Sequence, residues 1–378
     1  MGLSTARLHI IITDNTTWSI WNFRLSLVRA LLNSGHQVTV LAPLGSNAAD
    51  LKLLGCRLVP LEMDAKGLGP VKNYRLIRKF KSIFKKENPD IILSYTIKNN
   101  IFGAFAARSY GIPFIPNVTG LGTAFLSGGV LQRIAEILYR KAFRGLSIIF
   151  FQNTDDRDLF IDHNLIKLEQ AQTLPGSGID LKHFKAEAYP ETQDEVRFLL
   201  IARLLRDKGI YEFIDAARQV KARGGKASFQ LLGAADTENR TAIRRATVAE
   251  WEAEGVVEYL GTASDVRPYI KNSHCVVLPS YREGTPRTLL EAASMARPLI
   301  ATDVPGCRSV VDQNVTGFLC DAHSGDSLAV AVQKFLDLPR EVRIEMGRAG
   351  RAKMEHEFDN AIVARMYYDA IENLTEKK

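Results

Sequence analysis

The sequence predicts an α/β protein made of two doubly wound domains, and three observations lead to this prediction. The chain has 378 residues, too many for one ordinary domain of about 150 residues. Short apolar runs alternate with amphipathic segments from end to end, which is typical of βαβ units in a parallel sheet. A polar stretch with Pro and Gly at 174–194 interrupts this alternation. We therefore expect domains at 1–178 and 179–360 facing a cleft, and a final helix at 361–378 that returns to the first domain.

The elements of both domains follow from these runs. In the first domain we expect strands at Leu8–Ile12, Gln37–Ala42, Arg57–Leu61, Ile91–Tyr95, Pro113–Val118 and Ile148–Gln152, with helices at Asn22–Ser34, Asn73–Lys86, Ile101–Tyr110 and Val130–Arg144. In the second we expect strands at Arg197–Ala202, Ser228–Leu232, Val256–Leu260, Cys275–Pro279, Pro298–Thr302 and Gly317–Cys320, with helices at Gly209–Ala222, Thr285–Ala296 and Asp326–Leu336.

Composition excludes several classes of protein. A hydrophobic content of 46% with 24% charged residues argues against disorder and against collagen-like repeats. The four cysteines form no CxxC pair, which favours a reducing, cytosolic setting. No run approaches the roughly 18 to 20 apolar residues of a spanning helix, and the start resembles no secretion signal. We expect any membrane contact to be peripheral.

Charge is distributed unevenly between the two halves. Residues 1–185 carry 23 Lys and Arg against 13 Asp and Glu, whereas residues 186–378 carry 26 against 29. Such asymmetry indicates an anionic partner for the first half, whether nucleic acid, a membrane surface or a phosphorylated substrate. Nucleic acid is disfavoured because the basic segments lack aromatic stacking platforms and any recognised module.

The densest basic segment is 65–86, which carries eight basic residues and no acid. Its apolar residues fall at helical spacing, so it predicts an amphipathic basic helix suited to an anionic bilayer. A second basic element lies at 131–144. The alternative to membrane contact is purely structural: the apolar stripe packs on the sheet, and the charged face is exposed to solvent. The residues predicted to contact the membrane are Lys72, Arg75, Lys79, Arg133 and Arg140.

The richest chemical motif runs from Pro279 to Glu291. A predicted buried strand leads through a short loop into a helix with Thr285 as N-cap and Pro286 at the first position. The positive end of this helix faces the carboxyl edge of the sheet, where a diphosphate binds readily. Glu283 lies on the lip, and Glu291 lies five residues past Pro286, about 7.5 Å along the helix axis. Two such carboxylates suit the hydroxyl groups at opposite ends of a nucleotide-sugar.

A structural interpretation of these acids stays open. On this interpretation Glu283 favours a helix N-terminus and Glu291 is a solvated helix residue. Against this, Glu291 is flanked by Leu289–Leu290 and Ala292–Ala293, an apolar setting that seldom accepts an unpaired charge.

A second cationic element lies at Ile201–Gly209, after the first strand of the second domain. Arg203 and Lys208 would place fixed positive charge beside a leaving diphosphate, although both residue types are common in surface loops. No GxGxxG follows the first strand of the chain, so a nicotinamide or flavin fingerprint is missing. Asp156-Arg-Asp158 has the form of a metal-binding DxD, but Asn153 before it predicts a helix cap instead. The seven histidines show no metal-binding spacing, and we expect no metal and no cofactor.

The string EGTPRTLLE at Glu283–Glu291 resembles the Glu-x7-Glu motif of retaining GT-B glycosyltransferases of family 4. The resemblance covers essentially the whole chain, and it is most similar to the subgroup that extends undecaprenyl-diphosphate-linked sugars for capsule, O-antigen or protein glycosylation. The further segments that carry it are Asn22–Leu25, Thr119–Phe125, Leu174–Asp180, Ile201–Gly209, Ser280–Arg287 and Thr302–Cys307.

The resemblance implies a role for each donor-side residue. Glu283 would contact the donor sugar and the charge developing at its anomeric carbon, and Glu291 would bind the ribose hydroxyls. Arg203 and Lys208 would stabilise the diphosphate leaving group. Gly233 would line the base pocket. Gly284, Thr285, Pro286 and Arg287 would line the donor site, where the backbone N–H groups of this segment hold the sugar or the phosphate.

On the acceptor side the chain departs from the family at two places. Thr16 and Thr17 stand where many members carry a Gly-Gly turn, and Thr119 and Gly120 lie where many carry a His. We expect these four residues to contact substrate. Family 4 enzymes need no metal.

We therefore predict a retaining transferase that moves a hexose or N-acetylhexosamine from a UDP-sugar to a polyprenyl-diphosphate-linked saccharide in bacterial surface glycan assembly. It would be cytoplasmic and peripheral on the inner face of the plasma membrane. Two alternatives stay open: a soluble nucleotide-sugar epimerase of the same fold, and a non-catalytic, membrane-associated UDP-sugar binder.

Overall fold

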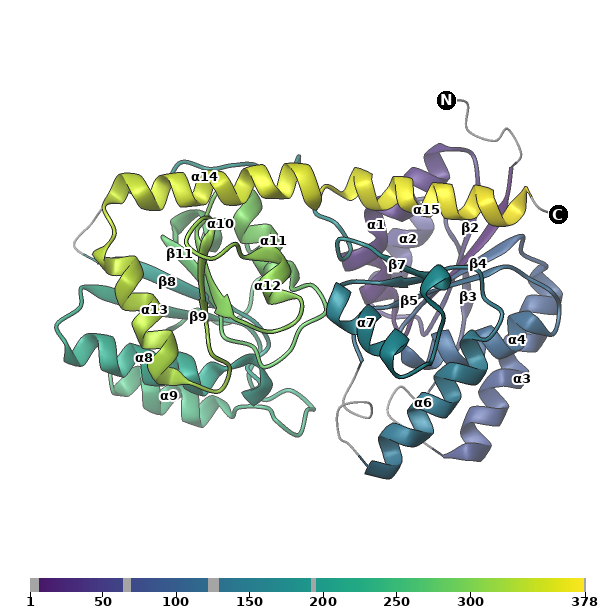
Figure 1. Cartoon of the computed structure of the whole chain (residues 1–378), viewed down its shortest axis with the longest axis horizontal. Coiled ribbons are helices and arrows are strands. Elements are labelled where there is room, and N and C mark those ends of the chain that lie inside the picture. Colours follow the sequence, from purple (N-terminus) through teal and green to yellow (C-terminus); the bar gives the residue numbers. More distant parts are fainter. Residues whose placement is uncertain (1–6, 64–68, 122–128, 192–194, 377–378) are drawn as a thin grey trace. The chain divides into compact units, whose positions relative to one another are not determined.

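The computed structural model describes residues 7–63, 69–121, 129–191 and 195–376 (Figure 1). The chain divides into two compact units, one formed by Met1–Ser177 with Asn360–Lys378 and the other by Gly178–Asp359. The first unit is thus discontinuous in sequence, because it is completed by the last residues of the chain.

Unit 1 contains a seven-stranded parallel sheet in the order β3-β2-β1-β4-β5-β6-β7. The order reverses between β1 and β4, where Thr13 pairs with Ser94. The carboxyl edge at such a reversal is the usual ligand site of a doubly wound sheet. The strands are β1 (His9–Thr13), β2 (Gln37–Ala42), β3 (Arg57–Pro60), β4 (Ile91–Tyr95), β5 (Phe114–Val118), β6 (Ile149–Phe151) and β7 (Ala171–Thr173).

Helices cover both faces of this sheet. One face carries α1 (Thr17–Asn33), α2 (Ala48–Leu53) and α15 (Asn360–Thr375), whose Val363, Tyr367, Ala370 and Ile371 are buried in the core there. The other face carries α3 (Pro70–Glu87), the π-helical turn η1 (Asn99–Gly103), α4 (Ala104–Arg108), α6 (Gly129–Phe143) and α7 (Thr154–Asp162). A 3₁₀ turn, η2 (Leu168–Gln170), precedes β7.

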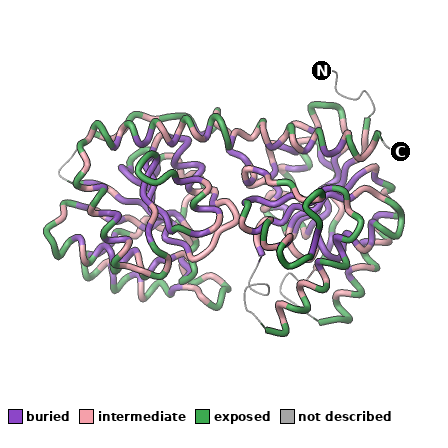
Figure 2. Tube along the Cα trace, viewed as in Figure 1, coloured by how far each residue is buried: buried purple, intermediate pink, exposed green. Residues whose placement is uncertain are grey.

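Unit 2 contains a six-stranded parallel sheet in the order β10-β9-β8-β11-β12-β13, so its order reverses between β8 and β11. The strands are β8 (Val196–Ile201), β9 (Ala227–Leu232), β10 (Glu258–Tyr259), β11 (Cys275–Leu278), β12 (Leu299–Thr302) and β13 (Gly317–Cys320). In both units the strands are mostly buried and the outer helix faces are exposed (Figure 2).

The sheet of unit 2 also lies between two helical layers. One layer contains α8 (Ile210–Ala222), α9 (Arg245–Ala253) and α13 (Gly325–Asp337). The other contains α10 (Arg267–Asn272), α11 (Arg287–Ser294), α12 (Cys307–Val310) and α14 (Arg340–Glu357). A short 3₁₀ turn, η3 (Arg206–Lys208), precedes α8.

Two doubly wound, parallel units confirm the predicted fold class. Three predicted helix starts were wrong. Helix α1 begins at Thr17 rather than Asn22, because Thr16 caps it by accepting a hydrogen bond from the Ser19 N–H at 3.0 Å. The third predicted helix of the first domain, Ile101–Tyr110, instead begins with a π-helical turn at Asn99. Helix α11 begins at Arg287, as described below.

Candidate active site

Three loops meet at the carboxyl edge of the unit 2 sheet, following β8, β11 and β12. The loop after β11 is bonded to the loop after β8: the Tyr281 N–H and the Ser280 hydroxyl donate to the Asp207 carbonyl at 3.0 and 3.1 Å. The Thr302 hydroxyl, at the end of β12, donates to the Ser280 carbonyl. These bonds fix the loop segments that carry the predicted donor residues.

Two glycines let these segments approach closely. Gly209 has φ +72°, and a Cβ there would lie 2.0 Å from the Pro279 carbonyl oxygen. Gly233 has φ +154°, and a Cβ there would lie 1.7 Å from the Ala202 carbonyl oxygen. Any larger residue would push the strands' end loops apart. Glycine is therefore required at position 233 by this close approach, in addition to its predicted role in lining the base pocket.

Lys208 and Glu283 form an ion pair across these loops, with Nζ donating to Oε1. Both side chains are largely withdrawn from solvent, at 24% and 14% exposed. A paired acid and base so placed are charged but mutually neutralised. Arg203 lies exposed in the same loop as Lys208, so the structure brings Lys208 and Glu283 together and leaves Arg203 at the surface.

Glu291 lies within α11 and is only 9% exposed, so its interpretation as a solvated helix residue is wrong. Arg287 donates to its Oε1 at 2.7 Å, one helical turn away. Burial raises the pKa of the Glu291 carboxyl, and the positive charge of Arg287 opposes that rise. This second acid is therefore also neutralised by a neighbouring base.

The start of α11 differs from the prediction. Helix α11 begins at Arg287, with Pro286 at the N-cap position in an extended conformation (φ −74°, ψ 112°) and without a side-chain cap. Thr285 is therefore not the N-cap, because the extended Pro286 delays the first helical residue. Gly284 and Thr285 lie in the loop just before it, so the helix N-terminus still opens at the carboxyl edge of the sheet.

Sequence reasoning missed the side-chain contacts that Tyr281 makes in this loop. The Tyr281 ring lies 3.7 Å, centroid to centroid, from the His323 ring, and its hydroxyl donates to Glu212 Oε1 at 2.8 Å. Burial and this carboxylate raise the pKa of Tyr281 to about 12. Tyr281 stood inside the recognised string, but its partners come from distant segments and carried no sequence signal.

In unit 1 the predicted acceptor residues lie at the carboxyl edge of the sheet. Thr16 is the N-cap of α1, and the Thr17 hydroxyl accepts from the Gly45 N–H at 2.9 Å. Both threonines thus have structural partners. Thr119 and Gly120 directly follow β5 and are partly exposed. Residues 122–125 of the same recognised segment lie outside the described part of the chain.

A buried polar cluster was missed at this edge. Arg24, at 6% exposed, places its guanidinium 4.1 Å from the centre of the Tyr95 ring, and its Nε finds no hydrogen-bond partner among the described residues. Asp14 is buried nearby; desolvation raises its pKa, and the charge of Arg24 opposes this. The Asn117 amide donates to the Tyr367 hydroxyl of α15 at 3.0 Å. Arg24 stood in a recognised segment, but nothing in the sequence indicated its burial.

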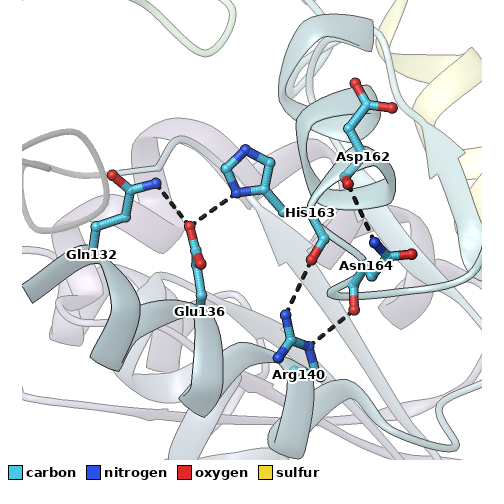
Figure 3. Close-up of polar contacts among 6 residues, drawn as sticks. All are labelled: Gln132, Glu136, Arg140, Asp162, His163 and Asn164. Carbon is cyan, nitrogen blue, oxygen red and sulfur yellow. Dashed lines mark hydrogen bonds and ion pairs between the residues drawn. The ribbon is translucent and has the colours of Figure 1, made fainter. Parts of the chain in front are cut away.

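The predicted membrane residues lie on α3 and α6, and all five are exposed. Arg140 is also engaged within the protein, because its guanidinium donates to the carbonyls of Asn164 and His163 at 3.0 and 3.1 Å (Figure 3). One turn earlier on α6, Glu136 accepts from Gln132 at 2.7 Å and contacts His163 Nδ1 at 2.9 Å. Residues 65–68 of the predicted basic segment lie outside the described residues.

Both helices expose apolar side chains beside their basic ones. On α3, Val71 and Tyr74 are 61% and 62% exposed; on α6, Val130 is 74% exposed, with Ile134 and Ile137 also exposed. The alternative interpretation, in which the apolar residues pack on the sheet, therefore does not hold for Tyr74, Ile134 and Ile137. Within the described ranges no helix has the length and apolarity needed to cross a membrane.

The Asp156-Arg-Asp158 segment lies near the start of helix α7. Asn153 caps α7 by accepting from the Asp156 N–H at 2.8 Å, as the sequence predicted. Asp156 is buried there. Across the described parts of the chain, no group of three or more His, Cys, Asp or Glu side chains is arranged to hold a metal ion.

Two family models match the chain, one to each unit. The model of group 1 glycosyl transferases matches residues 182–353, and the model of the glycosyl transferase 4-like domain matches residues 20–176. The chain belongs to the group 1 glycosyltransferases. This glycosyltransferase therefore has the GT-B architecture, with the group 1 model on the unit that holds Glu283 and Glu291.

Curated relatives have related activities in their names. The N,N'-diacetylbacillosaminyl-diphospho-undecaprenol α-1,3-N-acetylgalactosaminyltransferase of Campylobacter jejuni is 28% identical over 376 residues, covering 93% of this chain and 96% of the relative. The UDP-Gal:α-D-GlcNAc-diphosphoundecaprenol α-1,3-galactosyltransferase of Escherichia coli is 25% identical, covering 75% of this chain and 73% of the relative.

Solved structures show the same fold. The Anabaena protein HepE in complex with UDP-glucose superposes with a TM-score of 0.79 at 17% identity, covering 97% of this glycosyltransferase and all of that chain. A glycosyltransferase of Rickettsia africae also gives 0.79, at 15% identity and 99% coverage of this chain, with all of its own chain covered.

Proposed function

We propose that this glycosyltransferase transfers a hexose or N-acetylhexosamine from a UDP-sugar to a polyprenyl-diphosphate-linked saccharide, with retention of anomeric configuration. The observation that carries the donor half is the Lys208–Glu283 ion pair at the carboxyl edge of unit 2, beside the N-terminus of α11. The acceptor half rests on the activities named for the two curated relatives.

The proposed donor chemistry is an exchange of ion partners. The UDP diphosphate forms an ion pair with Lys208. Arg203 and the first N–H groups of α11 add positive charge. Glu283, released from Lys208, then faces the donor sugar and the positive charge that develops at its anomeric carbon. Glu291, held by Arg287, accepts hydrogen bonds from ribose hydroxyls. The leaving diphosphate is stabilised by fixed protein charges, so this scheme assigns no step to a metal or a cofactor.

We place the enzyme in the cytoplasm, peripheral on the inner face of the plasma membrane. Supporting this are the exposed basic residues Lys72, Arg75, Lys79 and Arg133 beside the exposed apolar side chains of α3 and α6. Apolar insertion combined with attraction to anionic lipid is the usual way a protein lies on a bilayer.

The test is transfer by purified protein from a panel of UDP-hexoses and UDP-N-acetylhexosamines to undecaprenyl-diphosphate saccharides. We expect one donor to give product with retained configuration, and Glu283→Gln to lower kcat by roughly 10² to 10³. Glu254→Gln is the matched control, because Glu254 pairs with Arg218 on the surface of the same unit. Absence of transfer with every donor and acceptor would reject the proposal, and epimer or free sugar released without acceptor would indicate an epimerase instead.

A further inference from the structure

Tyr281 lies two residues before Glu283, in the loop that follows β11 of unit 2. Its side chain reaches two segments that are distant in sequence: the hydroxyl donates to Glu212 Oε1 at 2.8 Å, and the ring lies 3.7 Å, centroid to centroid, from the His323 ring. Its backbone N–H donates to the Asp207 carbonyl at 3.0 Å. This one residue therefore joins the loop that carries Glu283 to three other segments of unit 2.

The hydroxyl contact involves a carboxylate that has an unused oxygen. Glu212 lies in the first turn of α8 and is half-buried. Its Oε1 accepts from the Tyr281 hydroxyl, whereas its Oε2 is withdrawn from solvent and accepts no hydrogen bond from the described residues. Burial and this carboxylate raise the pKa of Tyr281 to about 12, so the hydroxyl keeps its proton and donates. Loss of the hydroxyl would leave Glu212 without this bond, and a withdrawn acceptor without a partner is costly.

The ring contact is made by a residue with an uncommon backbone conformation. His323 lies between β13 and α13, directly before Ser324, the N-cap of α13. Its φ is +60°, in the left-handed region that few residues other than glycine adopt. Ser324 is itself fixed, because its hydroxyl accepts from the Ser327 N–H at 3.0 Å. Such conformations persist where their surroundings impose them, and they cluster at functional sites. Here the conformation belongs to the residue whose ring lies on Tyr281, at an interplanar angle of 35°.

The proposed exchange of ion partners places a requirement on this loop. In the ligand-free protein the ion pair with Lys208 holds the Glu283 side chain. When Lys208 pairs with the diphosphate, that restraint is lost at the moment when Glu283 must face the anomeric carbon. A misplacement of about 1 Å can cost roughly 10² in rate. A restraint independent of Lys208 is therefore needed, and the contacts of Tyr281 meet this need because neither Glu212 nor His323 takes part in the exchange.

We propose that Tyr281 is a positioning residue for Glu283, held at its hydroxyl by Glu212 and at its ring by His323. This inference rests on the proposed function, because it concerns the place of Glu283 during sugar transfer. Binding of the UDP diphosphate depends on Lys208, Arg203 and the start of α11, whereas the transition state also needs Glu283 in place. Loss of the support should therefore lower kcat and leave UDP affinity almost unchanged.

Steady-state kinetics with a UDP-sugar and a lipid-linked acceptor tests this separation. We expect Tyr281→Phe to lower kcat roughly tenfold and Tyr281→Ala roughly a hundredfold, with the donor KM changed less than twofold. The stoichiometry of UDP binding, measured by calorimetry, counts the folded enzyme, so a loss of folded protein is not mistaken for a loss of kcat. Tyr211→Phe is the matched control, because Tyr211 is 42% exposed on α8 and its ring packs against Trp251. Wild-type kcat in both Tyr281 variants, or an equal loss in Tyr211→Phe, would overturn the proposal.

A double-mutant cycle tests the hydroxyl contact. Tyr281→Phe and Glu212→Ala remove the same hydrogen bond, so we expect the double variant to be no slower than the slower single variant. Glu212→Gln keeps an accepting oxygen for the hydroxyl, and we expect its kcat to stay within about threefold of the wild type. Fully additive losses, or a Glu212→Gln enzyme as slow as Glu212→Ala, would contradict a role for this bond.

The ring contact is tested by a pair of variants. We expect His323→Ala to lower kcat roughly fivefold and His323→Phe to restore it to within about twofold, because phenylalanine keeps an aromatic face on Tyr281. His356→Ala is the control, since His356 lies exposed on α14 of the same unit. A wild-type kcat in His323→Ala, or no recovery in His323→Phe, would reject the part assigned to His323.

Amide hydrogen exchange keeps this inference distinct from the proposed function, because it needs no activity. We expect residues 279–291 to exchange faster in Tyr281→Phe than in the wild type or Tyr211→Phe, and the difference to be largest with UDP bound. Such a difference in a protein without transferase activity would support the positioning of the loop and reject the proposed function. An active transferase in which Tyr281→Phe changes neither exchange nor kcat would reject the positioning and leave the proposed function intact.

Discussion

The carboxyl edges of the two sheets differ in how their charges are balanced. In unit 2 each predicted acid faces a base, Lys208 with Glu283 and Arg287 with Glu291. In unit 1 the pocket beside α3, lined in part by Glu62 and Lys79, contains an ion pair between these two residues whose side chains are 91% and 49% exposed. The pairs of unit 2 are withdrawn from solvent and must exchange partners when a ligand binds, whereas an exposed pair opens at little cost. The two edges therefore differ in how strongly their ion pairs are coupled to ligand binding.

The largest effect should come from breaking the paired edge. Lys208→Met leaves the Glu283 carboxylate largely withdrawn from solvent without its base and removes positive charge from the leaving group. We expect kcat to fall by roughly 10² to 10³, measured under saturating donor and acceptor. Lys221→Met is the control, because Lys221 lies exposed on α8, where it donates to the Gly255 carbonyl at 2.6 Å. A Lys208→Met enzyme with the wild-type rate would show that the ion pair has no role in turnover.

A smaller effect should follow from replacing the buried acid of α11. Because burial raises the folded-state pKa of Glu291 above its unfolded value, the folded state holds the proton more tightly between the two values. Stability should therefore fall as pH rises through that window. Glu291→Gln removes this titration, so we expect Tm to vary less with pH there, and UDP binding to weaken roughly tenfold.

Thermal unfolding between pH 4 and pH 7, with and without UDP, measures both effects. Glu258→Gln is a suitable control, because Glu258 accepts from Gln230 at 2.7 Å on an exposed edge. A Glu291→Gln protein with the wild-type pH dependence and the wild-type stabilisation by UDP would contradict the role of this carboxyl.

The smallest effect should come from a cation of unit 1 that lies outside the pocket. Arg140→Gln removes the guanidinium bonds to the carbonyls of His163 and Asn164 in an exposed loop. We expect a loss below about 1 kcal/mol, or a fall in Tm of about 3 °C or less, with acceptor KM unchanged. A raised acceptor KM in Arg140→Gln would show that this guanidinium takes part in acceptor binding as well as in holding the loop.

The strands were predictable wherever burial on both faces leaves a continuous apolar run. The predicted Gln37–Ala42, Ile91–Tyr95 and Gly317–Cys320 coincide with β2, β4 and β13. Strand β7 (Ala171–Thr173) was missed, because it is short, partly polar and lies at the edge of the sheet. The start of α11 was misplaced because proline fixes φ but not ψ, so Pro286 was free to remain extended.

The candidate site was predictable where its residues lie close in sequence. Glu283 and Glu291 belong to one strand–loop–helix segment, and its spacing was sufficient to find them. Arg24 was not found as a site residue, since a single basic residue within a helix has no pattern of its own. Only the fold buries Arg24 against Tyr95.

The discontinuity of unit 1 has a consequence for biosynthesis. The core beneath α1 includes Val363, Tyr367 and Ile371 from α15, which the ribosome adds after the whole of unit 2. Unit 2 is continuous from Gly178 to Asp359 and can close as soon as it emerges. Unit 1 is therefore begun before unit 2 and completed after it, and its apolar face beside α1 stays open to chaperones or to aggregation until α15 has emerged.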